Sequence, residues 1–252
     1  MPATAPGPTR ARSPLRRANQ VAAGAFLVGG SLFATGALLA QADIGGPRLA
    51  AIVYMVGGVF FSTGGYASVL LAINAPHRRR DGTWARRPWR WWAREPRNYD
   101  YLAAAVLFAG TIVFAINLVD SLLGHLTPTQ QDRLIWNPDL IGCALFLIAG
   151  HLAMVDISGS WWRVRGEGLG WWIVFVNQVG SVLFMVAAVA SFVRADGDMI
   201  AVALANWGTF GGALCFALAG VMQFYEPRQA ANFGLGPRPT ARFTFPRLRP
   251  LD

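Results

Sequence analysis

Five polar residues interrupt long apolar stretches, and they are the side chains of this sequence with the most scope for chemistry. They could line a polar path for a solute or an ion, or they could form hydrogen bonds between helices. A polar group in lipid is costly unless a partner satisfies it, so each is a candidate for function. The five residues are Asn117, Asp120, His151, Asn177 and Asn206.

His151 has the widest chemical range of the five, because imidazole can relay protons or bind haem or a metal ion. Haem with two histidine ligands needs a second histidine that is buried at a facing depth. The other two histidines lie at the margins of apolar stretches, His77 in a basic segment and His125 near an apolar end. We therefore favour an interhelical hydrogen bond for His151, and we expect no cofactor and no metal ion.

The sequence contains none of the motifs that mark common enzyme active sites. It has no Gly-x-Ser-x-Gly elbow, no His-Glu-x-x-His zinc helix and no glycine loop that ends in Lys-Ser or Lys-Thr. Lysine is missing from all 252 positions, which also removes the usual Schiff-base nucleophile. We therefore expect that the protein is not an enzyme.

The elements that must position these polar residues are six apolar stretches. Hydrophobic residues make up 54% of the chain and charged residues 14%, and the mean hydropathy is +0.38. A helix needs about 20 apolar residues to cross the hydrocarbon of a bilayer. We therefore predict an all-α polytopic membrane protein whose six transmembrane helices lie near residues 19–41, 48–73, 101–123, 138–157, 170–193 and 199–223.

The distribution of arginine predicts the orientation in the membrane. All 22 basic residues are arginine, a bias that is typical of a high-GC bacterial genome. Only Arg48, Arg133 and Arg194 fall between spans one and two, three and four, or five and six, and the others flank the opposite ends. By the positive-inside rule, we expect a multi-pass protein of the plasma (inner) membrane with both termini in the cytoplasm.

Each predicted span contains a glycine that is followed four residues later by phenylalanine. Residues four apart share a helix face, so glycine lets a neighbouring backbone approach while the ring fills the adjoining groove. In the even spans a second glycine extends this packing stripe. The even-span stripes are Gly57, Phe61 and Gly65; Gly142, Phe146 and Gly150; and Gly212, Phe216 and Gly220. The odd-span pairs are Gly29 and Phe33, Gly110 and Phe114, and Gly180 and Phe184.

The recurrence of this stripe predicts three tandem copies of a two-helix hairpin. We place the hairpins at 19–76, 98–157 and 168–227. The connecting segments at 77–97 and 158–167 are expected to be cytoplasmic loops. The basic tail at 1–18 and the Pro- and Arg-rich tail at 228–252 are expected to be disordered.

The first connecting segment combines arginine with Trp84, Trp89, Trp91 and Trp92. Arginine contacts anionic headgroups and tryptophan favours the membrane interface. We therefore expect the lipid bilayer, and anionic headgroups at its cytoplasmic face, to be the partner. No nucleic-acid motif accompanies the positive charge, so nucleic acid is not expected. A homo-oligomer or another membrane protein remains an open alternative.

The third hairpin resembles the YrhK-like family of two-helix membrane modules. The residues that carry the resemblance lie at 177–184 and 206–216, where glycine, a small residue and aliphatic residues precede phenylalanine. The second hairpin matches less well and the first least. The resemblance implies a membrane domain of unknown function and supplies no catalytic residues.

Two functions are consistent with this sequence. The first is a non-enzymatic structural or interaction module built from YrhK-like hairpins. The alternative is a small-solute or ion transporter or channel with a polar path between the repeats. In the second case the five polar residues should converge on one cavity near the bilayer midplane.

Overall fold

The computed structural model confirms an all-α fold of six long apolar helices. It describes residues 13–75, 77–78, 84–85, 88–123, 126–161 and 168–225. Each long helix has the length and hydropathy of a membrane span. The six are α1 (Ser13–Gln41), α2 (Gly46–Asn74), α3 (Tyr99–Asp120), α5 (Asn137–Ser158), α6 (Gly168–Ala190) and α7 (Val202–Tyr225).

Short elements join some of these helices. A two-stranded antiparallel hairpin, β1 (His77–Arg78) and β2 (Trp84–Ala85), lies between α2 and α3. After α3 in the sequence come two short helices, α4 (Pro128–Gln131) and the π-helix η1 (Asp132–Trp136), which lead directly into α5. A capping box starts α4, in which Thr127 and Gln130 satisfy each other's backbone N–H groups.

Helix α1 begins at Ser13, so the expectation of a disordered tail over 1–18 is wrong for residues 13–18. The apolar pattern marks the part of a helix that lies in lipid, whereas the helix itself can continue into water. Pro14 suits a first helical turn, and Arg16 and Arg17 tolerate an aqueous environment. Parts of the predicted loops and tails, at residues 1–12, 79–83, 86–87, 162–167 and 226–252, lie outside the described residues.

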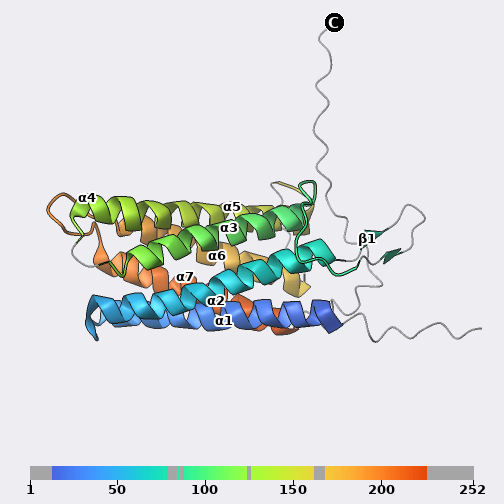
Figure 1. Cartoon of the computed structure of the whole chain (residues 1–252), viewed down its shortest axis with the longest axis horizontal. Coiled ribbons are helices and arrows are strands. Elements are labelled where there is room, and N and C mark those ends of the chain that lie inside the picture. The colour runs from blue at the N-terminus through green and yellow to red at the C-terminus, as the bar shows by residue number, and fades with distance from the viewer. Residues whose placement is uncertain are drawn as a thin grey trace, which may run out of the picture.

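The six helices form a closed ring. Each packs against two others, in the order α1, α2, α3, α5, α6, α7 and back to α1. The helices run along the long axis of the molecule (Figure 1). We call the end that carries α4 and η1 the turn end. The end that carries β1, the start of α1 and the end of α7 is the terminal end.

Within a hairpin, the phenylalanine of each helix packs on the glycine of the other. A Cβ atom at Gly29 would lie 2.8 Å from the Phe61 ring, and one at Gly57 would lie 2.7 Å from the Phe33 ring. The same reciprocal contacts join Gly110 to Phe146, Gly142 to Phe114, Gly180 to Phe216 and Gly212 to Phe184. The glycine–phenylalanine spacing therefore sets the register of all three helix pairs.

The second glycine of each even span faces the next hairpin. A Cβ atom at Gly65 would meet Phe108 of α3, one at Gly150 would meet the Gln178 side chain of α6, and one at Gly220 would meet the Leu27 backbone of α1. Phe108, Gln178 and Leu27 each lie two residues before the glycine of the glycine–phenylalanine pair in their own helix, which is Gly110, Gly180 and Gly29 respectively. Three copies of one hairpin around an axis would produce this correspondence.

The ring closes between helices that are far apart in the sequence, and amide pairs join both ends of that contact. Asn19 of α1 and Gln223 of α7 exchange hydrogen bonds of 3.3 Å and 3.1 Å near the terminal end. Near the turn end, the Asn206 Nδ2 donates to Gln41 Oε1 at 3.1 Å. The two pairs are about 33 Å apart along α1, which is close to the thickness of the hydrocarbon.

Substituting Gly220 with alanine tests the closing contact. The new methyl group would lie 2.8 Å from the Ala23 carbonyl oxygen and 2.8 Å from the Leu27 nitrogen, and neither backbone atom can move freely. We expect Gly220→Ala to lower the free energy of unfolding by about 1–3 kcal/mol, the usual cost of overpacking. The measurement is equilibrium unfolding of the detergent-solubilised protein.

Gly24→Ala in the same interface is the matched control. A Cβ atom there would meet only Phe224, at an ordinary 3.6 Å. The control should cost nothing, because alanine also has the better helix propensity. Equal losses in the two variants would contradict the close α1–α7 contact.

Candidate functional site

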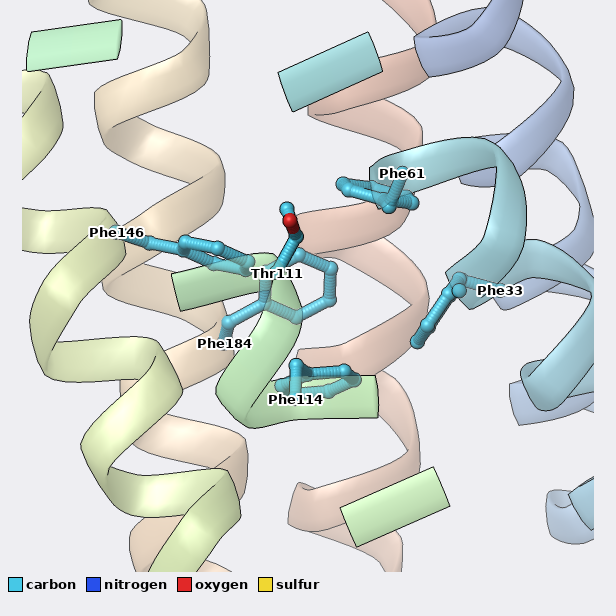
Figure 2. A pocket seen from close by; sticks show the side chains of 7 residues that line it. Phe33, Phe61, Thr111, Phe114, Phe146 and Phe184 are labelled. Atoms are coloured by element: carbon cyan, nitrogen blue, oxygen red, sulfur yellow. The ribbon is translucent and has the colours of Figure 1, made fainter. Parts of the chain in front are cut away.

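Six phenylalanine rings, one from each long helix, meet in the middle of the ring of helices. Their centroids form a connected network, for example 5.1 Å between Phe33 and Phe61 and 5.5 Å between Phe184 and Phe216. Figure 2 shows five of the rings turned toward one another from different helices. We call the six the phenylalanine cluster, and they are Phe33, Phe61, Phe114, Phe146, Phe184 and Phe216.

The phenylalanine cluster fills the centre of the bundle. A cavity that is lined by five of its rings, Gly58 and Thr111 has a volume of only about 10 Å³. That is no more than the space of one water molecule, and its lining is almost wholly apolar. The side chains that occupy the middle of the membrane span are therefore a packed aromatic core.

The two candidates on α3 lie in different environments. Asn117 is buried, with 6% of its surface exposed, and its side-chain amide makes no hydrogen bond within the described part of the chain. Asp120 is half-buried on the outer surface of α3, beside the exposed Ile116 and Val119. Although Asn117 and Asp120 are only three residues apart on α3, the structure does not bring them into one site.

The other three candidates have separate surroundings. His151 is exposed, and its ring lies 5.5 Å from the ring of Trp161. Asn206 belongs to the amide pair with Gln41. The Asn177 side chain is half-buried, and its Oδ1 atom is buried without a hydrogen-bond partner. The structure thus distributes the five candidates over several contacts and does not gather them in one cavity.

A polar site that the sequence analysis missed lies between the phenylalanine cluster and the turn end. Asp139 of α5 accepts a hydrogen bond on Oδ1 from Cys143 Sγ at 3.8 Å. Tyr54 of α2, which packs against the core, lies within electrostatic range of Asp139. Asp139 falls at the margin of its apolar stretch. A carboxylate at such a position is usually interpreted as a side chain exposed to water at the end of a helix.

Helix register places Asn117 opposite Asp139. Gly110 contacts Phe146 and Gly142 contacts Phe114, which fixes how α3 and α5 run past each other. Asn117 lies three residues beyond Phe114, and Asp139 lies three residues before Gly142, so this register puts the two residues level with each other along the α3–α5 contact. We call Tyr54, Asn117 and Asp139 the polar layer.

A second polar region lies at the terminal end, where residues 88–98 pack along α2 and α3. Arg90 forms an ion pair of 2.7 Å with Glu95 and donates to the Ile73 carbonyl at 2.6 Å. The Asn74 side chain exchanges two further hydrogen bonds with the Arg90 backbone. These bonds leave Trp91 and Trp92 exposed, at 66% and 61% of their surfaces.

This terminal surface is aromatic and positively charged. Arg94 and Arg97 are exposed beside the two tryptophans, and Trp161 and Trp172 are partly exposed at the ends of neighbouring helices. Among the described residues, no group of three or more His, Cys, Asp or Glu side chains is placed to hold a metal ion. The terminal surface can therefore offer stacking surfaces and guanidinium groups to a ligand.

Truncation of one ring tests the packing of the phenylalanine cluster. Phe61→Ala removes a buried ring that contacts Phe26, Phe33 and Phe216, so it leaves a void. We expect a loss of about 3–5 kcal/mol in the free energy of unfolding, as for buried phenylalanine elsewhere. The adjacent Phe60 is exposed on the outside of α2, so Phe60→Ala should cost far less. Similar losses would contradict a central cluster.

Comparison with known proteins found no match to any family model, to any curated protein or to any solved structure. The resemblance of the third hairpin to the YrhK-like family therefore stays a prediction. The structure by itself identifies a multi-pass membrane protein with six candidate spans.

Proposed function

We propose that the protein is a non-enzymatic structural or interaction module of the membrane. The observation that carries this proposal is the phenylalanine cluster, which fills the centre of the closed ring and leaves a cavity of about 10 Å³. A packed core supplies rigidity and no room for a substrate. A closed bundle of this kind presents its two ends and its outer surface to partners.

The alternative, a transporter or channel, requires a polar path through the bundle. Such a path needs side chains that replace the water of an ion or a solute along its route. The six rings stand across the middle of the ring of helices, and the five candidate residues lie in separate contacts. Both observations favour the structural module.

The terminal surface is the part of this module that we propose binds anionic lipid headgroups. Trp91 and Trp92 suit the interface between water and lipid, while Arg94 and Arg97 suit phosphate groups. On this proposal the terminal end is cytoplasmic, the membrane is the inner membrane of a bacterium, and the three hairpins are YrhK-like modules. Self-association or a membrane protein partner would use the remaining lipid-facing surface.

A flux measurement tests the absence of a path. The purified full-length protein is reconstituted into liposomes, and the movement of sodium, potassium and protons is followed with ion-sensitive dyes. We expect rates equal to those of empty liposomes, because the central cavity is too small for a hydrated ion. A channel-forming peptide added at the end verifies the assay, and a saturable flux would overturn the structural module.

Charge removal tests the lipid surface. In nanodiscs, the melting temperature of the protein should be higher with phosphatidylglycerol than with phosphatidylcholine. Each basic residue at an anionic surface contributes about 1 kcal/mol, so the double variant Arg94→Gln and Arg97→Gln should lose most of this difference.

The control removes the same charge from the turn end. Arg48 and Arg133 are exposed there, and the double variant Arg48→Gln and Arg133→Gln should keep the stabilisation by phosphatidylglycerol. If both double variants respond alike, the anionic lipid acts through total charge and the terminal surface has no special role.

A further inference from the structure

Asp139 is an acidic side chain inside a membrane span without a counter-charge. It lies on α5, two turns from Phe146 on the turn-end side of the phenylalanine cluster. No arginine of the described residues forms an ion pair with it. A carboxylate inside a membrane span is costly when it lacks a cationic partner, so it is a candidate for function.

The groups that face Asp139 are few and uncharged. Cys143 of its own helix donates to Oδ1, and Tyr54 of α2 is the nearest other titratable group. On α3 the residue that the helix register places level with Asp139 is Asn117, and α6 contains no titratable side chain. The charged residues of the adjoining turns point elsewhere, since Asp132 accepts from the Val193 N–H and Arg48 and Arg133 are exposed.

Asn117 supplies an independent observation. Its side chain is more than nine-tenths buried, and its amide has no hydrogen-bond partner among the described residues. An amide inside a membrane span is costly when it lacks a partner, so it is a candidate for a bound species or a functional role. The α3–α5 register puts this amide level with Asp139 across the helix contact.

We propose that the polar layer is an intramembrane proton-binding site, in which the Asp139 carboxyl group reversibly binds one proton. The uncharged acid removes the cost of an unpaired charge inside the membrane span, and its O–H group becomes a donor that the Asn117 side-chain oxygen could accept. Binding forms one O–H bond and releases nothing else. The site goes beyond the proposed structural role, because a rigid module does not itself require an acid in its core.

Infrared spectroscopy of the full-length protein in nanodiscs tests the site. A protonated carboxylic acid shows a carbonyl stretching band that a carboxylate lacks. At pH 6, solvated Asp and Glu side chains are almost fully ionised, so they contribute very little to this band. We expect the wild-type protein to show the band, to shift it in deuterium oxide, and to lose it in Asp139→Asn.

The variants are chosen so that the result does not depend on a folding defect. Asparagine has the shape of the uncharged acid and carries both a donor and an acceptor, so Asp139→Asn should keep the wild-type melting temperature. Asp120→Asn, on the outer surface of α3, should keep the band. If Asp139→Asn does not fold, selective ¹³C labelling of aspartate in the wild-type protein identifies the band.

Two results would overturn the proposal. The first is a wild-type protein without the band, or with a band that survives Asp139→Asn. The second is a band that sodium or potassium abolishes at constant pH, because this would make the polar layer a metal-cation site with an ionised carboxylate. A band that is insensitive to both cations and disappears only with Asp139 supports proton binding.

Discussion

The close fit of phenylalanine against glycine is the interaction on which the rest of this structure depends. Lipid chains are as apolar as the helices, so burial away from water cannot hold transmembrane helices together as it holds a soluble core. Packing must do so instead. Each hairpin places a ring of one helix where the other helix has no side chain, and the same contact recurs in the reverse direction. Two helices can meet at these points only in one register.

The same contact determines where polar groups can lie. Because the rings that fit against glycine also point toward the centre, they close the middle of the bundle and divide its interior in two. The polar layer lies on the turn-end side of the phenylalanine cluster, whereas the buried Oδ1 of Asn177 lies on the terminal-end side. A solute that crossed the bundle would have to separate rings whose centroids are 5–6.5 Å apart.

Much of this fold follows from the sequence, because span length and the Gly-x-x-x-Phe spacing are local signals. The six helices are predicted from apolar length alone, and the spacing names the six residues that form the cluster. The candidate site, in contrast, could not be predicted from the sequence. Asp120 and Asp139 both lie at the ends of apolar stretches. Only the rotation of each helix about its own axis decides that Asp120 lies on the outer surface while Asp139 contacts Cys143. Likewise, helix α1 extends past its apolar stretch because helix ends in water carry no hydrophobic signal.

The pairing of α1 with α7 must be specified by contacts alone, because no loop brings these two helices together. Backbone atoms approach each other there, as the positions of Gly30 and Gly220 show. Close packing alone would permit a slide by one turn wherever small residues recur. The amide pairs at the two ends of this contact remove that freedom, because Asn19 with Gln223 and Gln41 with Asn206 would both lose their partners in any other register. Their place near the membrane margins also keeps the cost of each amide low, because water is close to both ends.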